Sequence, residues 1–569
     1  MNNLTPNYKT LTSIPLFRRA VLQSFPFIEE DFDALTDYEL LSKVVEYLNN
    51  VIEQQNLVGE NTDELLRVYL QLKDYVEHYF DNLDVQEEIN NKLDEMVEDG
   101  TITTIITNIV NPVLADLTEQ INATETRVNN LANSISTPIE ELRKKYYDNY
   151  STFELPSQLN SYFSILQLYR SNDKANFKHN IRKEMLPFTT SETVYVDNVN
   201  GSNSNDGSTK ALAFKTIDYA ISSASSNRTV ILLNDIYYRT EMPNSARAIS
   251  YDFNFISENG HSVMGLFDKL TYSTDETYTN VYKAARTNAN MCIDIRGHKN
   301  GAYAQLERVD SLLLCSNTLN SWYTDGTDVY VNIGESVDND KILFGLGVGG
   351  SPWNITNSSK ALHLYFENID FIANNYAIMK LQCSTYVHEV RMYGCKLLFC
   401  TNSDYDGFSN QGCKSLLVKT TADRNYKDGF NYHAYNSKKA YGIEIDCIGS
   451  NNGYGNNANN NNGSTAHDGC QVIRVNGNYF NNKGGNVADV SQDTLTACIN
   501  CNAFDTTATQ GGGYNTDFVT QQAGATMYLY NCFSSGSNSD TNLLAVPNST
   551  IYYDNCKFDT SSGNVIELN

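Results

Sequence analysis

A short segment with Cys or Asn just before an aromatic residue recurs through the C-terminal part of the chain. Most neighbouring copies lie 24 to 31 residues apart. A unit of this length cannot bury its own hydrophobic face, so it must stack on its neighbours, and the interval fits one turn of a parallel β-helix. Stacked Asn and Cys side chains would satisfy one another's hydrogen bonds, which predicts structural ladders. The copies read "ENIDF", "GCKLLF", "NGNYF", "NCNAF", "NCF" and "NCKF", at Asn368, Cys395, Gly477, Cys501, Cys532 and Cys556.

The segment "TVYVDNVNGSNSNDGSTKALAFKTIDYAI" stands before these repeats and combines a strand, a turn and an amphipathic helix. It resembles the beginning of right-handed parallel β-helices of the pectin-lyase-like kind, which occur in polysaccharide lyases, glycosidases and tail spikes of tailed bacteriophages. The resemblance implies a mainly β fold for residues 191–569, with the helix plugging the open first coil. The residues that carry it are Val194 to Val196, Asp197, Asn205-Asp206-Gly207, and Phe214, Ile217, Ala220 and Ile221 on one helical face.

Residues 1–138 are expected to be α-helical. Capping boxes at Thr36 with Glu39 and at Asp84 with Glu87 predict helices within residues 1–100. Within residues 101–138, apolar residues alternate at intervals of four and three from Val110 to Ile135, which predicts a coiled coil and a homotrimer. Residues 139–190 show no firm period and are interpreted as a neck.

Charge and composition limit the partners of the chain. The formal net charge is -26, and residues 1–100 hold 21 acidic against 7 basic residues. Such a chain repels nucleic acid and anionic membranes. The sequence shows no secretory signal and no apolar run long enough to span a bilayer, so we expect no membrane insertion. All 12 cysteines follow residue 291 without a zinc pattern, which predicts reduced buried thiols formed in a cytoplasm, and no cofactor or metal site.

Aspartates recur with a spacing of their own, at Asp406, Asp428, Asp468, Asp489, Asp517 and Asp540. If these residues stack on successive coils, neighbouring carboxylates should lie about 5 Å apart and next neighbours about 10 Å apart. Glycoside hydrolysis uses separations of roughly 5 Å in retaining enzymes and roughly 6.5 to 9.5 Å in inverting ones. A purely structural alternative is equally simple, because Asp before Gly is a common corner in a repeated coil.

Two members of this series stand close to histidines and to other polar residues. Asp428, Asp468, His433 and His467 are therefore the predicted catalytic residues. A loop rich in asparagine, residues 451–463, is expected to overhang the same coils and to suit sugar hydroxyls. The predicted glycan-binding residues are Tyr432, Glu444, Asp446, Asn462 and Arg474, of which Arg474 would serve as the base of a lyase.

The order of helical region, coiled coil, neck and β-helix resembles a tail spike, appendage or fibre protein of a tailed bacteriophage. The resemblance implies that residues 1–100 bind other virion proteins and that the β-helix meets a host surface polysaccharide. It also implies assembly in the host cytoplasm and exposure on the particle. Two hypotheses remain open, a glycan depolymerase (hydrolase or lyase) and a non-catalytic adhesin or capsid-decorating fibre. A bacterial surface lyase is less favoured because the sequence shows no signal peptide.

Overall fold

The computed structural model describes residues 117–128, 149–159, 161–243, 249–337, 340–350, 352–356, 360–401, 405–453, 461–507 and 514–568. The chain divides into two compact units, Met1–Ser151 and Thr152–Asn569. In the first unit residues 117–128 are helical, and Leu117, Ile121 and Val128 are its half-buried positions. The predicted helices of residues 1–100 and the rest of the predicted coiled coil lie outside the described residues, so these expectations stay predictions. Among the described residues, no helix has the length and apolar character that a membrane span needs.

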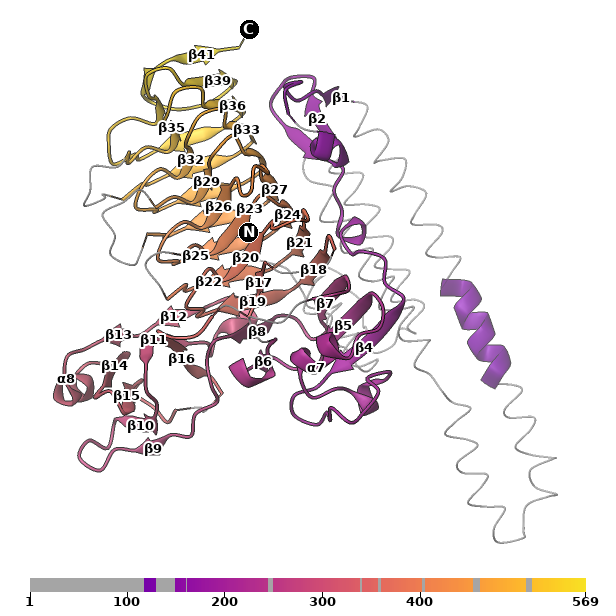
Figure 1. Ribbon diagram of the computed structural model, residues 1–569, viewed down its shortest axis with the longest axis vertical. Coiled ribbons are helices and arrows are strands. Elements are labelled where there is room, and N and C mark those ends of the chain that lie inside the picture. The colour runs from indigo at the N-terminus through magenta and orange to yellow at the C-terminus, as the bar shows by residue number, and fades with distance from the viewer. Residues whose placement is uncertain are drawn as a thin grey trace, which may run out of the picture. The chain divides into compact units, whose positions relative to one another are not determined.

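The second unit is built around three sheets of parallel strands that stack in chain order, as the run from orange to yellow in Figure 1 shows. Nearly every coil contributes one strand to each sheet, which is the pattern of a parallel β-helix. Sheet 1 contains β4 (Glu192–Val196), β5 (Arg228–Leu232), β7 (Phe253–Ser257), β18 (His363–Glu367), β21 (Glu389–Tyr393), β24 (Lys414–Val418), β27 (Tyr441–Ile445), β30 (Gln471–Val475), β33 (Leu495–Ile499), β36 (Thr526–Tyr530), β39 (Thr550–Asp554) and β41 (Val565–Glu567).

The other two parallel sheets have nine strands each. Sheet 2 contains β6 (Ile236–Tyr237), β8 (Ser262–Gly265), β19 (Ile369–Ile372), β22 (Lys396–Leu398), β25 (Thr421–Asp423), β28 (Ile448–Ser450), β31 (Asn478–Phe480), β34 (Asn502–Phe504) and β37 (Phe533–Ser535). Sheet 3 contains β17 (Asn354–Ile355), β20 (Met379–Gln382), β23 (Phe408–Gln411), β26 (Phe430–His433), β29 (Ser464–Ala466), β32 (Val487–Asp489), β35 (Phe518–Thr520), β38 (Leu543–Ala545) and β40 (Ser561–Gly563). The predicted mainly β, parallel architecture is confirmed.

Ladders of polar residues fix the corners between strands. Between sheets 1 and 2 the chain turns through a left-handed residue, and Asp446, Asn476 and Asn500 hold this position with φ of 53°, 54° and 54°. Asn and Asp tolerate this conformation better than other side chains. The Asn476 amide donates to Asp446 (3.0 Å), and the Asn500 amide donates to Asn476 (2.9 Å). Inside the coils a second ladder runs through Asn452, whose amide donates to Asn482 (3.0 Å). The predicted ladders are therefore confirmed for Asn, whereas the stacked Cys thiols donate to backbone carbonyls, as Cys501 does to Arg474 (3.3 Å).

The first coil is closed by the helix that the sequence predicts. Helix α7 (Ile217–Ser222) begins at Thr216, whose hydroxyl accepts a hydrogen bond from the Tyr219 N–H. Its apolar face, which includes Ile217 and Ile221, is buried in the main core with the first strands of sheet 1. This face covers core side chains that the first coil would otherwise expose to water.

Residues 152–190 belong to the β-helix unit, which corrects the interpretation of residues 139–190 as one separate neck. They form short elements: β1 (Tyr150–Phe153), η4 (Ser161–Ile165), β2 (Leu168–Ser171), β3 (Phe177–His179) and η5 (Lys183–Met185). Phe163, Leu168 and Leu186 pack in one hydrophobic cluster with Ile443 and Ile473 from sheet 1. Sheet 1 is thus covered on its outer face, which explains why its strands are apolar on both sides.

An insertion of mostly antiparallel strands lies between β8 and β17, within the residues that were predicted to form the β-helix. The insertion contains β9 (Ser273–Thr274), β10 (Tyr282–Ala285), β11 (Ala289–Asp294), β12 (Ala304–Gln305), β13 (Glu307–Arg308), α8 (Leu312–Asn317), β14 (Ser321–Thr324), β15 (Asp328–Asn332) and β16 (Ile342–Leu346). The fully buried carboxylate of Asp370 on β19 accepts a hydrogen bond from Tyr303 in the insertion. It also meets His261 (2.6 Å) and Lys396 (3.3 Å), so this carboxylate ties the insertion to the β-helix.

Candidate functional site

Strand β26 shows how sheet 3 distributes its side chains. Phe430 and Tyr432 lie in the main hydrophobic core, so the alternate residues Asn431 and His433 face outward. Asn431 stands in register with Ser409 on β23 and Thr465 on β29. The outer face of sheet 3 therefore carries a continuous row of polar side chains across neighbouring coils.

Asp406 and Asp428 occupy equivalent positions on neighbouring coils, each two residues before its strand of sheet 3. Phe408 pairs with Phe430, and the Gly407 N–H donates to the Asp428 carbonyl (2.8 Å). Neighbouring positions of this kind lie about 5 Å apart. Both side chains are buried, with exposed fractions of 5% and 2%. Burial, together with the nearby Asp406 carboxylate, raises the pKa of Asp428 to about 7.

The surroundings of this pair contain buried polar atoms that have no hydrogen-bond partner. These atoms are Oδ1 of Asp406, Oδ1 of Asn462, and both amide atoms of Asn431. The Asp428 carboxylate itself accepts from the Asn462 N–H (2.7 Å). Buried polar groups normally have partners, so the unpaired atoms leave hydrogen-bonding capacity for a polar ligand or water. Lys380 faces outward on β20, and burial lowers its pKa while Asp406 opposes this shift.

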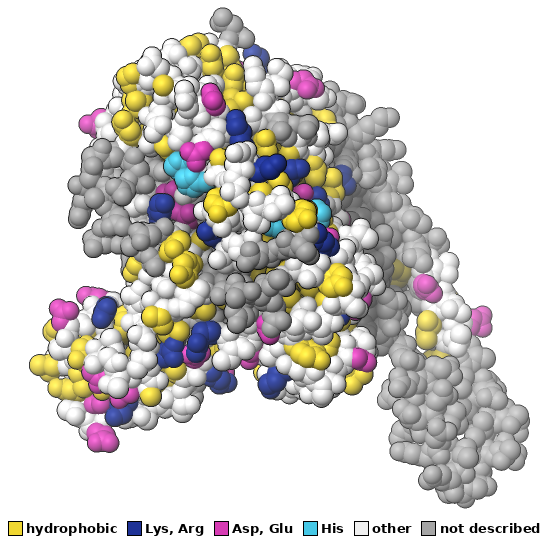
Figure 2. Space-filling model, viewed as in Figure 1, with side chains coloured by type: hydrophobic (Ala, Val, Ile, Leu, Met, Phe, Trp, Pro, Cys, Tyr) yellow, Lys and Arg dark blue, Asp and Glu magenta, His cyan; other side chains and the backbone are white. Residues whose placement is uncertain are grey.

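At the other end of the same strands lies a cluster of His433, His467 and Asp468. The two imidazole rings stack with centroids 4.0 Å apart and an interplanar angle of 10°. His433 Nδ1 lies 3.1 Å from Asp468 Oδ2, and these two side chains are 30% and 45% exposed. Burial lowers the pKa of His467 well below its usual range, and His433 and Lys427 add to this shift. Figure 2 shows histidine and acidic side chains side by side on one face.

The structure brings three of the predicted catalytic residues together but places Asp428 with Asp406 and not with Asp468. Tyr432 pairs with Ala466, so Asp468 stands opposite residue 434, six positions beyond Asp428. Asp468 follows β29 in a left-handed conformation (φ 57°), whereas Asp428 precedes β26. The expectation of one aspartate register is therefore wrong, because the Asp-Gly pairs mark two different corners. Asp489 belongs to neither, since it stands in register with Ala466 inside the coil.

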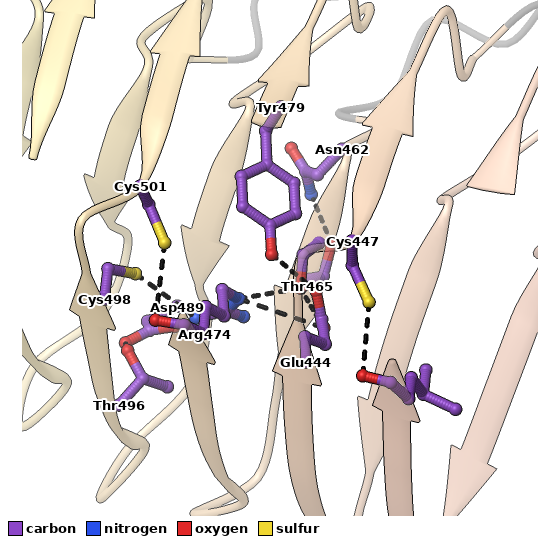
Figure 3. A network of polar contacts seen from close by, with 12 residues as sticks. Glu444, Cys447, Asn462, Thr465, Arg474, Tyr479, Asp489, Thr496, Cys498 and Cys501 are labelled. Atoms are coloured by element: carbon purple, nitrogen blue, oxygen red, sulfur yellow. Dashed lines mark hydrogen bonds and ion pairs between the residues drawn. The ribbon is translucent and has the colours of Figure 1, made fainter. Parts of the chain in front are cut away.

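Three predicted glycan-binding residues lie inside the β-helix, as Figure 3 shows for Glu444 and Arg474. Tyr432, Glu444 and Arg474 are fully buried and point into the coils, away from the outer face of each sheet, so the prediction that they contact a glycan is wrong. Their strand positions have the inward parity, and the sequence does not reveal this for polar residues. Asp446 is half-buried at a coil corner, and Asn462 is buried beside Asp428. The glycan-binding role of these last two residues stays a prediction.

The interior residues form an ionic network of their own (Figure 3). Arg474 lies 4.0 Å from Glu444 and 3.8 Å from Asp489, and its Nε donates to Ser464 Oγ (2.8 Å). The Tyr479 hydroxyl donates to Glu444 (2.7 Å). Burial raises the pKa of Asp489 to about 7, while Arg474 opposes the shift. The buried charges of Arg474, Glu444 and Asp489 compensate one another, and a large ligand cannot reach them.

No protein-family model matches the sequence, and a comparison with curated proteins finds no match either. Among solved structures, one named "Glycoside hydrolase" is 8% identical with a TM-score of 0.44, and the match covers 66% of this chain and 96% of that one. Pectate lyase Pel9A is 13% identical with a TM-score of 0.31, covering 67% and 82% of the two chains. The tailspike protein gp49 from Pseudomonas phage LKA1 is 8% identical with a TM-score of 0.16, covering 60% and 70%.

The residues that surround Asp428 were not predicted from the sequence. Asp406 was in the aspartate series, but its register with Asp428 emerges only from the strand pairing. No sequence motif marks Asn431, Lys380 or Thr465 as part of a site. The alternation of inward and outward residues along β20, β26 and β29 could have suggested them once the strand limits were known.

Proposed function

We propose that this chain binds a surface polysaccharide and cleaves it by glycoside hydrolysis at the outer face of sheet 3. The observation that carries the proposal is the pair of carboxyls at Asp406 and Asp428, one coil apart, of which Asp428 has a pKa of about 7. A group with this pKa holds a proton near neutral pH and can still release it, as a general acid and base must.

The spacing of the pair suits a retaining mechanism, in which the two carboxyls lie roughly 5 Å apart. Asp428 would give its proton to the glycosidic oxygen as the bond to the anomeric carbon breaks. Asp406 would attack that carbon and form a glycosyl ester. Water, deprotonated by Asp428, would then displace Asp406 and regenerate the starting state. Because both carboxyls are buried, substrate binding has to make them accessible.

The exposed cluster at the other end of the strands is suited to holding the same glycan. His433 and Asp468 together offer a donor and an acceptor at a half-exposed position. Asn431 lies between this cluster and Asp428 on one strand, so a chain of several sugars that follows β26 would meet all of them. Sugar hydroxyls can supply the hydrogen bonds that the Asn431 amide lacks.

The proposal extends to the whole chain as a virion protein, a tail spike, appendage or fibre. Residues 1–100 would bind other virion proteins, residues 101–138 would form a homotrimer, and the β-helix would be exposed on the particle after assembly in the host cytoplasm. Replacing Leu117 and Ile121 with Asp should place charges in the seam and cost several kcal/mol per trimer. Light scattering that still showed an intact trimer would assign the assembly to another segment.

The enzyme and adhesin hypotheses can be distinguished by whether new reducing ends form when the protein is mixed with glycan. The purified protein should be incubated with capsular and lipopolysaccharide fractions from a panel of bacterial strains, and new reducing ends should be counted. We expect saturated oligosaccharide ends from one fraction. Unsaturated ends would indicate a lyase instead, and binding without new ends would favour the non-catalytic adhesin.

A further inference from the structure

The last coil of the β-helix is its least protected part. Most residues of β40 and β41 are exposed, whereas no residue of β38 and β39, the strands on which they stack, is exposed. The last strand of sheet 2 is β37. Beyond it, only an isolated bridge joins Phe533 to Lys557 on the next coil. A terminal coil has one neighbour in place of two, so it is the first to open in a stacked repeat.

Three cysteines are stacked in a column at this end of the β-helix. Asn502 pairs with Phe533, which bridges to Lys557, so the preceding residues Cys501, Cys532 and Cys556 hold equivalent positions on three consecutive coils. The Cys532 N–H donates to the Cys556 sulfur (3.3 Å). Eleven of the 12 cysteines are buried, and Cys556 is the one that is partly exposed. The column therefore ends at the cysteine that is least buried.

The geometry of neighbouring coils is compatible with a covalent link. Equivalent residues on adjacent strands have Cα atoms about 4.8 Å apart, and disulfides form at Cα separations of about 4.4 to 6.8 Å. The hydrogen bond from Cys532 lowers the pKa of the Cys556 thiol. A larger thiolate fraction at an accessible position favours exchange with a disulfide.

We propose that Cys556 is a thiol-exchange site, which reacts with a low-molecular-weight disulfide and then closes a bond to Cys532. In the first step the Cys556 thiolate attacks glutathione disulfide, forms a mixed disulfide and releases one glutathione thiolate. In the second step the Cys532 thiol loses its proton and attacks the Cys556 sulfur, which releases the second glutathione. One oxidant is reduced to two thiols for each protein disulfide formed. The product links the last coil to its neighbour.

The test uses the full-length native chain and glutathione disulfide as the probe, followed by peptide mapping and a denaturant titration. Wild type should lose two hydrogens, with the bond mapped to Cys532 and Cys556, and its unfolding midpoint should rise. Cys532→Ser should stop at one bound glutathione on Cys556, and Cys556→Ser should stay unmodified.

Two results would overturn the proposal. One is native wild type that keeps 12 free thiols at a glutathione disulfide concentration that fully modifies the unfolded chain. The other is modification spread evenly over many cysteines, since that would reflect unfolding and not a site. Because the mapping is done on wild type, the test does not depend on whether either serine variant folds.

Discussion

The interior of the coils and the outer face of sheet 3 hold ionisable residues in opposite conditions. Inside the coils, Glu444, Arg474 and Asp489 are fully buried and compensate one another. On the outer face of sheet 3, His433 and Asp468 are partly exposed, and the side-chain amide of Asn431 has no hydrogen-bond partner. The difference shows that a charged residue in this repeat is a functional candidate only if it lies on the outward side of its strand.

The largest effect should come from breaking the inner network. Arg474→Met leaves Glu444 and Asp489 buried without their cation, so the free energy of unfolding should fall by about 3–5 kcal/mol. Urea titration measures this loss. An outer-face change, His433→Gln, should stay within about 0.5 kcal/mol under the same conditions. Similar losses in both variants would contradict the distinction between the two sides.

The inner carboxyl should also make stability depend on pH. The pKa of Asp489 in the folded state, about 7, lies above its ordinary value of 3.8, so the folded protein holds this proton more tightly. The contribution of this group is therefore greatest below the ordinary value and is lost as the pH rises through about 7. Between about pH 6 and about pH 8 the loss should be about 1.4 kcal/mol.

Asp489→Asn should remove this part of the slope, as measured by urea titration at the two pH values. His388, whose pKa burial lowers from 6.5 to about 4, acts in the opposite direction within this window, because the unfolded chain takes up this proton more readily than the folded protein. The test is therefore the difference in slope between wild type and Asp489→Asn. Asp428, with a pKa of about 7, contributes a slope of the same sign, so the variant should keep a residual dependence. A variant with an unchanged slope would show that Asp489 is ionised throughout.

The smallest effect should come from the exposed cluster. His433→Gln should weaken glycan cleavage by about tenfold, the scale of one lost hydrogen-bonded contact. The matched control is His363→Gln, because His363 Nδ1 also meets a carboxylate, at 3.2 Å from Asp252, but on sheet 1. Equal activity of the two variants would show that the cluster at His433 does not contact the glycan.

The fold was largely predictable because the repeat forces it. The Cys and Asn positions recur at one coil length, and the apolar face of helix α7 was visible in the sequence. The insertion around β10 and β11 was not predictable, since antiparallel strands of this kind carry no repeat. The packing of residues 152–190 on sheet 1 was also missed, because long-range packing leaves no period in a short segment.

The candidate site was predictable only in part. Asp428, His433, His467 and Asp468 lie on or beside strands of sheet 3, but residue spacing alone paired the wrong aspartates. The cause is the loop before β29, which lengthens one interval, so Asp468 falls after its strand and not before it. Polar residues with inward parity, such as Glu444 and Arg474, cannot be recognised without the strand limits.

The central claim is that the Asp406–Asp428 pair cleaves glycan, and oligosaccharide release by matched asparagine variants tests it most directly. Asp406→Asn and Asp428→Asn should each lower the rate by at least about a hundredfold, the scale of one proton-transfer group, while melting temperature and oligomeric state stay near those of wild type. Asp540→Asn, at a left-handed corner before β38, should keep full activity. Full activity in either of the first two variants, or an equal loss in all three, would contradict the account.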